Sequence, residues 1–324
     1  MKYAWIEKNS ECFSVRTMCE VLEVSSSGLH AARTRGPSKR QRDDERLLEQ
    51  IRGAHRTHRG RYGRRRMTPE VRDATGRVVN EKRIGRLMRE HGLQSHKRRR
   101  FRVVTTDSRH SHPIAANVLR RDFVARAPNR KWLADITFVP SAEGWLYAAF
   151  VLDLFARKIV GWAMSPTMPQ TLTLAALQVA LGWRDPDPGQ LVHHSDRGSQ
   201  YAAEDYRKVL AARGIEVSMS GKGDCWDNAP MESFNGTLKV ECVHGEHFRT
   251  RAEAQQALVE YIGYYNTERR HSSLGNLSPA AFERHWEAAT FEQPQAYHCR
   301  APHRVIHRRP VSGSSQATEP AVRG

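Results

Sequence analysis

The apolar positions divide the chain into a helical front part and a body in which strands and helices alternate. Val15, Met18 and Leu22 recur at helical spacing, residues 25–28 interrupt the pattern with three serines and a glycine, and Leu29 resumes it. This spacing predicts a small helix-turn-helix over residues 13–33, although any two packed helices give the same pattern.

A second helical segment follows a basic linker. Leu47 and Ile51 are spaced for one face of a helix, and residues 58–66 form an arginine-rich segment that we expect to be a turn. Thr68 followed by Pro69 resembles an N-cap with proline at the first helical position. The pattern therefore predicts that the next helix begins at Thr68.

The last helix of the front part is predicted over residues 80–91 and ends at Gly92. Ile84, Leu87 and Met88 fall on its inner side, and its basic residues face outward. Such a helix can lie against a phosphate backbone or in a major groove, but it can also be an ordinary soluble helix. The candidate DNA contacts of the front part are Arg64, Arg65, Arg66, Lys82, Arg83 and Arg86.

From Lys131 the pattern changes to that of an α/β protein. Three strands separated by short turns predict an antiparallel meander, and short strands then alternate with helices. This order predicts a mixed five-stranded sheet with flanking helices on both faces. We expect strands at residues 131–139, 145–152, 158–164, 190–194 and 215–219, and helices at residues 171–183, at 203–213 and from Asn228 to about His244.

The charges are unevenly placed along the 324 residues. Residues 1–130 hold 32 Lys and Arg against 14 Asp and Glu, whereas residues 131–290 hold 15 against 19. A basic front part on a slightly acidic body indicates one part that grips a polyanion and one that carries chemistry, although a merely solvated surface is the alternative. The predicted parts are a small helical segment at 1–42, a basic helical DNA-binding domain at 43–105, a linker at 106–127, a core at 128–285 and a flexible basic tail at 286–324.

The sequence shows no clear signal for membrane insertion, secretion or disulfide bonding. No stretch has the ~18 apolar residues that a membrane span requires, and residues 1–7 lack the apolar segment of a signal peptide. The five cysteines form no C-x-x-C pair, which argues against a disulfide framework and against a zinc site. We therefore expect a soluble, intracellular protein with reduced cysteines.

Three carboxylates are the candidate chemical groups. Asp135 lies in the middle of an apolar strand, where an ionised group is costly unless it is paired or binds a cation. Asp196 directly follows a short strand, where open α/β sheets collect their ligands, although its surroundings also suit an ordinary turn. Glu232 lies in the first turn of its helix, where an acid that only stabilises the helix end is the alternative.

The helix of Glu232 carries a polar stripe. Asn228, Glu232, Asn235 and Lys239 share one face, so Glu232 can face a site while Lys239 reaches a phosphate two turns along. We take Asn235 and Lys239 as further candidate DNA contacts, and Asn228 as the predicted N-cap.

Three converging carboxylates suit hard divalent cations, because Mg²⁺ prefers oxygen ligands and keeps positions open for substrate phosphates. A pair of such ions activates a water or a 3′ hydroxyl and stabilises the leaving oxygen in an in-line displacement at phosphorus. His193 and His194 could join a metal shell, but we expect them to be packed or hydrogen-bonded groups of the strand.

The spacing of these acids resembles a known catalytic signature. Sixty residues separate Asp135 from Asp196, thirty-five separate Asp196 from Glu232, and Lys239 follows seven positions later, as in retroviral-integrase-like DDE transposases. The surrounding segments, together with residues 152–157, 223–229, 264–271 and 274–279, resemble the OrfB-type product of bacterial insertion sequences over roughly residues 13–283. The chain departs from that pattern at Phe138, where tyrosine is frequent, and at Asn235, where an aromatic residue is often found.

The resemblance implies a ribonuclease H-like core, dependence on Mg²⁺ or Mn²⁺ with two ions in the site, cleavage at element ends and strand transfer by the freed 3′ hydroxyl. It also implies element-end and target DNA as partners, a homo-oligomer on DNA, and an upstream reading-frame product or frameshift fusion partner. The implied setting is the bacterial cytoplasm in association with the nucleoid. A metal-dependent nuclease without strand transfer and a helix-turn-helix DNA-binding regulator are the alternative functions.

Overall fold

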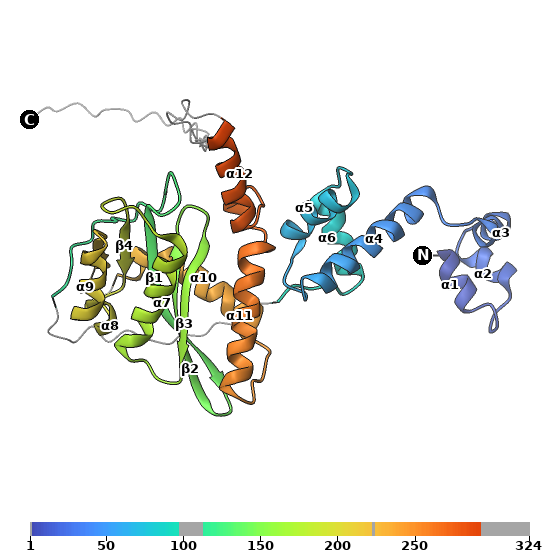
Figure 1. Ribbon diagram of the computed structural model, residues 1–324. Coiled ribbons are helices and arrows are strands. Elements are labelled where there is room, and N and C mark those ends of the chain that lie inside the picture. The colour runs from blue at the N-terminus through green and yellow to red at the C-terminus, as the bar shows by residue number, and fades with distance from the viewer. Residues whose placement is uncertain (1, 97–112, 222–223, 293–324) are drawn as a thin grey trace, which may run out of the picture. The chain divides into compact units, whose positions relative to one another are not determined.

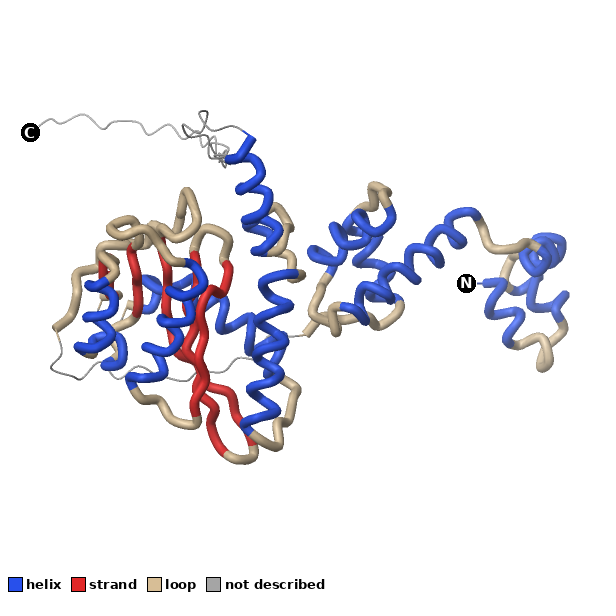
Figure 2. Tube along the Cα trace, in the orientation of Figure 1, coloured by secondary structure: helices blue, strands red, loops and turns tan. Residues whose placement is uncertain are grey.

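The computed structural model describes residues 2–96, 113–221 and 224–292. Its body is a mixed five-stranded sheet in the order β3-β2-β1-β4-β5, with helices on both faces (Figures 1 and 2). The predicted sheet and its meander are thereby confirmed. The strands are β1 (Lys131–Ser141), β2 (Gly144–Asp153), β3 (Lys158–Ser165), β4 (Val192–Ser195) and β5 (Glu216–Met219).

The central strand β1 separates two apolar layers, because successive side chains of a strand point to opposite faces. Trp132 and Ala134 belong to the layer formed with α7 (Gln170–Arg184), α8 (Ser199–Ala202) and α9 (Glu204–Ala212). Leu133 belongs to the opposite layer, formed with α10 (Ala229–Leu238) and α11 (Arg251–Thr267). By this alternation Asp135 shares the face of Leu133, which α10 covers.

The front part forms two helical groups. The helices α1 (Lys2–Lys8), α2 (Val15–Val21) and α3 (Ser26–Thr34) enclose a small core of Ile6, Met18, Cys19 and Leu29. The two helices predicted for residues 13–33 are confirmed, and α1 was not anticipated. The second group consists of α4 (Lys39–Thr57), α5 (Arg64–Thr75) and α6 (Glu81–Glu90).

Two predictions for the second group were wrong. Helix α5 begins at Arg64, with Gly63 as its N-cap, so Pro69 lies inside the helix and residues 64–66 are helical. Burial of Met67 and Val71 on one face fixes this longer helix, which outweighs the local N-cap signal at Thr68.

The outward orientation predicted for Arg83 and Arg86 also needs correction. Both guanidinium groups pair with the carboxylate of Asp44 in α4, each at 2.6 Å, and both side chains are about one-third exposed. Lys82, by contrast, is exposed. The ion pairs tie α6 to α4, so these two arginines support the helical group itself.

Buried polar contacts join α5 to the body. Glu241 lies in a π-helical turn, η2 (Lys239–Val243), which continues α10. Its carboxylate accepts from Arg269 at 2.7 and 2.8 Å, from Tyr261 at 3.0 Å and from Arg66 of α5 at 3.3 Å. Removing one basic partner would leave the buried charge of the Glu241 carboxylate uncompensated and would destabilise η2. The turn that continues α10 therefore depends on the contact with α5.

The predicted domain boundaries fall partly within and partly outside the described residues. The predicted end of the core at residue 285 falls inside α12 (Pro279–Glu292). Most of the predicted tail, the charge run at residues 97–100 and part of the linker lie outside the described residues, so the boundaries stay predictions. Within the described part, no helix is long and apolar enough to cross a membrane.

Close packing of α7 on β3 depends on one glycine. A Cβ at Gly161 would lie 2.3 Å from the carbonyl oxygen of Ala176 and 2.7 Å from the Cβ of Ala180. We expect Gly161→Ala to lower the free energy of unfolding by about 1–3 kcal/mol, because α7 must move away from the sheet. Chemical denaturation monitored by circular dichroism measures this change.

The matched control is Gly182→Ala in α7, where the added methyl group would meet no neighbouring atom within 4 Å. It should leave stability unchanged or raise it by up to about 1 kcal/mol, since alanine favours the helix. Equal stability of the two variants would contradict the packing described for β3 and α7.

Candidate active site

The pairing of β1 with β4 brings the first two candidate acids together. The strands are parallel, and their last matched pair is Ala134 with Ser195. Asp135 is the next residue on β1, Asp196 directly follows β4, and neighbouring strands lie about 5 Å apart. The backbone ladder thus places two carboxylates, with sixty residues between them in sequence, side by side at the end of β4.

The environment of Asp135 disfavours its ionised form. Burial raises the pKa of this carboxyl group well above its ordinary value, and the negative charges of Asp196 and Glu232 raise it further. Hydrogen bonds from the Ile136 amide at 2.9 Å and from Asn235 Nδ2 at 2.8 Å oppose this rise in pKa. No lysine or arginine among the described residues forms an ion pair with Asp135.

Glu232 approaches the pair from α10. It lies in the first turn of that helix, is exposed, and has a pKa raised by partial burial of its carboxyl group. Asn228 is the N-cap residue of α10, as predicted, but its side chain makes no capping bond, and its Nδ2 donates to the carbonyl oxygen of Ala134 at 3.2 Å. That bond attaches the start of α10 to β1, next to Asp135.

The charges of Asp196 and Glu232 affect the pKa of Asp135, but the three carboxylates do not form a preassembled metal site. Among the described residues, no three His, Cys, Asp or Glu side chains lie close enough to constitute a ready-made metal site. The donor set nevertheless fits a hard divalent cation, because it consists of carboxylate oxygens and because the repulsion that raises the pKa of Asp135 would be relieved by positive charge. Asp135 and Asp196 could hold such an ion, and Glu232 could complete its ligands.

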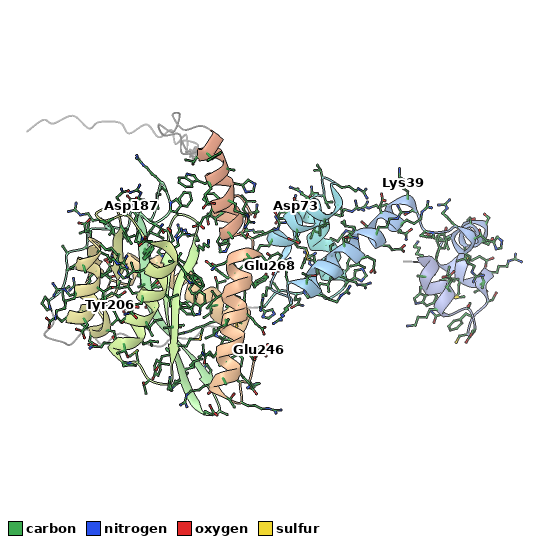
Figure 3. All side chains as sticks on the ribbon, viewed as in Figure 1. Lys39, Asp73, Asp187, Tyr206, Glu246 and Glu268 are labelled. Atoms are coloured by element: carbon green, nitrogen blue, oxygen red, sulfur yellow. The ribbon has the colours of Figure 1, made fainter. Side chains whose placement is uncertain are left out.

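His193 and His194 serve the fold, as expected. His193 Nε2 lies 3.0 Å from the hydroxyl of Tyr206 in α9, which Figure 3 labels. His194 lies between Ser218 at 2.8 Å and Ser220 at 3.1 Å. Burial lowers the pKa of His193 to about 3 and that of His194 to about 4, so both imidazoles are neutral hydrogen-bonding groups at physiological pH.

The two polar residues that follow Glu232 on its helix differ in exposure. Asn235 is buried and its amide donates to Asp135, so it is engaged inside the site. Lys239 is half-buried, and its Nζ lies 4.4 Å from the ring centroid of Phe138. Burial lowers the pKa of Lys239, and the charge of Asp135 opposes that change, which places the ammonium group near the acids.

The candidate DNA contacts of α5 are also unequal. Arg65 is exposed. Arg64 pairs with Glu81 at 3.0 Å but remains about half exposed, whereas Arg66 is held by Glu241 and by the carbonyl oxygen of Arg270. Arg65 is therefore the arginine of this group whose side chain is most available to a phosphate.

Two groups beside the site were missed by the sequence analysis. Trp226 belongs to the segment 223–229 that carried the family resemblance, but its type and position gave no sign that it would be exposed. Nothing in the sequence around Glu241 marks it as a buried ion-pair partner, although its partner Arg269 lies in segment 264–271, which also carries the family resemblance. The two residues are twenty-eight positions apart, and they meet only because α11 packs against η2 in the fold.

Comparison with known proteins agrees with this architecture. Residues 125–225 and 213–279 match two families that are both described as integrase core domain, and residues 41–101 match an HTH-like domain. An uncharacterized 31 kDa protein of insertion element IS600 from Shigella sonnei is 47% identical over 266 residues, which are 82% of this chain and 97% of the relative. Transposase InsF for insertion sequence IS3A of Escherichia coli (strain K12) is 43% identical over 287 residues, 87% of this chain and 98% of the relative.

Solved structures were also compared. A simian T-cell lymphotropic virus intasome in complex with a PP2A regulatory subunit aligns over 82% of this chain and 80% of the matched chain, at 12% identity and a TM-score of 0.42. The HTLV-2 integrase catalytic core domain in complex with magnesium aligns over 49% of this chain and 99% of that one, at 12% identity and a TM-score of 0.38.

The raised pKa of Asp135 predicts a stability change with a definite sign. The folded chain binds this proton more tightly than the unfolded chain, so stability falls as pH rises from about 4, where the unfolded carboxyl group ionises, to the raised pKa of about 8 in the folded chain. Asp135→Asn removes this cost. In EDTA at pH 8 the variant should melt about 2–6 °C above wild type, and the difference should shrink toward pH 4, as measured by calorimetry.

Asp153→Asn is the matched control. Asp153 is buried at the end of β2, where it accepts from the amides of Asn129 and Phe155 and pairs with Arg184. Burial raises the pKa of Asp153 too, but this variant should melt below wild type, because it breaks the buried ion pair with Arg184. A lower melting temperature for Asp135→Asn at pH 8 without metal would contradict the electrostatic account of the site.

Proposed function

This chain belongs to the retroviral-integrase-like DDE transposases of bacterial insertion sequences, and from that premise we propose that Asp135, Asp196 and Glu232 are its catalytic metal ligands. The observation that carries the proposal is that Asp135 and Asp196 directly follow the last matched pair of the parallel strands β1 and β4, with Glu232 close enough to affect the pKa of Asp135. Transposases are polynucleotidyl transferases, so the site must accept a scissile phosphate and a hydroxyl nucleophile.

The ligands fit two Mg²⁺ or Mn²⁺ ions. Bound divalent ions would supply a deprotonated hydroxyl nucleophile and charge stabilisation of the leaving oxygen. Asp135 lies within β1 and Asp196 directly follows β4, and Asn235 fixes the rotation of the Asp135 carboxylate through its 2.8 Å bond. Lys239, near the acids and two turns beyond Glu232, would bind a phosphate oxygen of the DNA.

The DNA substrate would be gripped by the basic front part as well. Arg65 and Lys82 are exposed on neighbouring helices α5 and α6 and would contact phosphates without reading sequence. We further propose a homo-oligomer assembled on element-end and target DNA, and cooperation with an upstream reading-frame product. These partners follow from membership of the family and not from contacts in this chain.

Strand transfer from a labelled, precut element end tests the assignment of the acids. Wild type with Mg²⁺ should join the 3′ hydroxyl end to target DNA, and EDTA should abolish joining. Asp135→Asn, Asp196→Asn and Glu232→Gln should each lower the rate by on the order of 1,000-fold, since loss of a metal ligand forfeits several kcal/mol of transition-state stabilisation. Gel electrophoresis of the joined products gives the rates.

Asp205→Asn, an exposed acid of α9, is the control and should retain wild-type joining. Hydrolysis without joining by the wild type would favour the metal-dependent nuclease. DNA binding without any cleavage would favour the regulator, and full activity of any of the three acid variants would remove that residue from the ligand set.

The salt dependence of DNA affinity tests the grip of the front part. Each phosphate contact contributes about 0.9 to the slope of log affinity against log salt, because counterions are released from the DNA. Arg65→Ala combined with Lys82→Ala should lower that slope by about 1–2, as measured by fluorescence anisotropy. Lys208→Ala with Arg213→Ala, exposed residues at the α9 end of the body, removes the same charge and should leave the slope unchanged.

A further inference from the structure

Trp226 is an exposed aromatic residue beside the proposed catalytic acids. It lies in the short 3-10 helix η1 (Cys225–Asn228), which directly precedes α10, and its side chain is 68% exposed. Scattered exposed apolar residues are normal on protein surfaces and by themselves indicate nothing. Trp226 differs because its backbone is held firmly and because it shares a cavity with Glu232.

A polar framework fixes the turn that carries Trp226. Asp227 is buried, and its carboxylate accepts from the Gly221 amide at 2.7 Å, from Arg121 Nε at 2.7 Å and from Asn117 Nδ2 at 2.9 Å. Asp224 accepts from the amide of Trp226 at 3.2 Å and also pairs with Arg121. The carboxylates of Asp224 and Asp227, on either side of Trp226, are therefore both bonded, while the indole itself is exposed.

The same turn is attached to the acids. Asn228, two residues after Trp226, donates to the carbonyl oxygen of Ala134, the residue before Asp135. A ligand stacked on the indole would thus lie at a defined position relative to β1 and to the first turn of α10. This arrangement has the pre-organisation that a positioning surface needs.

The cavity in front of Trp226 has the size and charge for nucleic acid. Its volume is about 820 Å³, which falls in the range of pockets that enclose small ligands. Trp226 and Glu232 line it together, and the guanidinium-bearing side chains of Arg61, Arg64 and Arg65 line it as well. A planar aromatic surface next to several arginines is the composition that binds an unpaired nucleobase and its phosphates.

We propose that Trp226 stacks on a nucleobase that leaves the helical stack at the DNA end held beside Glu232. This inference rests on the proposed function, because the ligand is the end of the DNA that the acids process. Stacking on an aromatic side chain is worth about 1–3 kcal/mol per base, comparable to the few kcal/mol that unstacking and unpairing one base cost. The displaced base frees space around the terminal phosphate, so that Glu232 can approach it.

The test measures binding without chemistry, so it does not depend on metal or on the catalytic assignment. The probe is a fluorescein-labelled duplex of about 30 base pairs that carries the terminal repeat read from DNA flanking the gene, with single mismatches placed in turn at each of the last few positions. Full-length protein is titrated in EDTA, and the affinity for each mismatched end is divided by that for the fully paired end.

Wild type should bind an end with a mismatch at one or two adjacent positions roughly tenfold more tightly than the fully paired end, because a mismatched base does not have to be unpaired before it stacks on Trp226. Trp226→Ala should reduce this ratio to near 1, and Trp226→Phe should retain most of it. An abasic site at the same position should abolish the dependence on Trp226, since no base remains to stack.

Trp183→Ala is the control, because Trp183 is similarly exposed at 65% and lies at the end of α7. It should keep the wild-type ratio, and melting temperatures should show all variants folded. The proposal is overturned if wild type shows no preference for mismatched ends or if Trp226→Ala keeps it. If the ratios behave as expected while strand transfer fails, the proposed function is wrong and stacking at the DNA end stands.

Discussion

The parallel pairing of β1 with β4 is the interaction on which the candidate site depends. Four matched residue pairs set the register, and the residue after the last pair is an aspartate in both segments. A shift by one residue would turn Asp135 to the opposite face of the sheet, away from α10 and from Glu232. The apolar layers on both sides of β1 prevent that shift, because Trp132 and Leu133 would exchange layers at a large cost in buried area.

The fold accepts a local electrostatic cost at this point. Asp135 and Asp196 repel one another in a partly buried setting, and the compensation supplied by the chain to Asp135 is limited to neutral donors such as Asn235. Asp153, fully buried at the end of the neighbouring strand, shows the alternative arrangement with two amides and Arg184. Burial raises the pKa of both carboxyl groups, but Asp153 has a cationic partner in the fold, and we propose that a bound cation takes that place for Asp135.

Much of this could be predicted from sequence, because local patterns carry it. The pattern in residues 131–164 predicted the meander, and the helix predicted from Asn228 is present as α10, whose buried face carries Met231, Phe234 and Leu238. Asp135 was identifiable because an aspartate inside an apolar strand is unusual, whereas Asp196 and Glu232 were distinguished by the spacing of the family signature. The start of α5 was misplaced because the N-cap signal at Thr68 is local, whereas burial of Met67 is a property of the assembled helices.

The remaining errors share a physical cause. The pairing of Arg83 and Arg86 with Asp44, and that of Arg269 with Glu241, joins residues far apart in sequence, and charge patterns on one helix cannot show it. Because these arginines pair with acids of the same chain, part of the positive charge that the sequence suggested for DNA binding stabilises the fold instead. The basic character of the front part therefore overstates the number of side chains available to phosphates.

Anomalous scattering from crystals of the protein with Mn²⁺ and an element-end duplex tests the central claim most directly. The account predicts an anomalous manganese peak at the site of Asp135 and Asp196, which would hold the ion together with Glu232. Manganese bound elsewhere, or a complex with DNA in which those two carboxylates carry no metal, would contradict it.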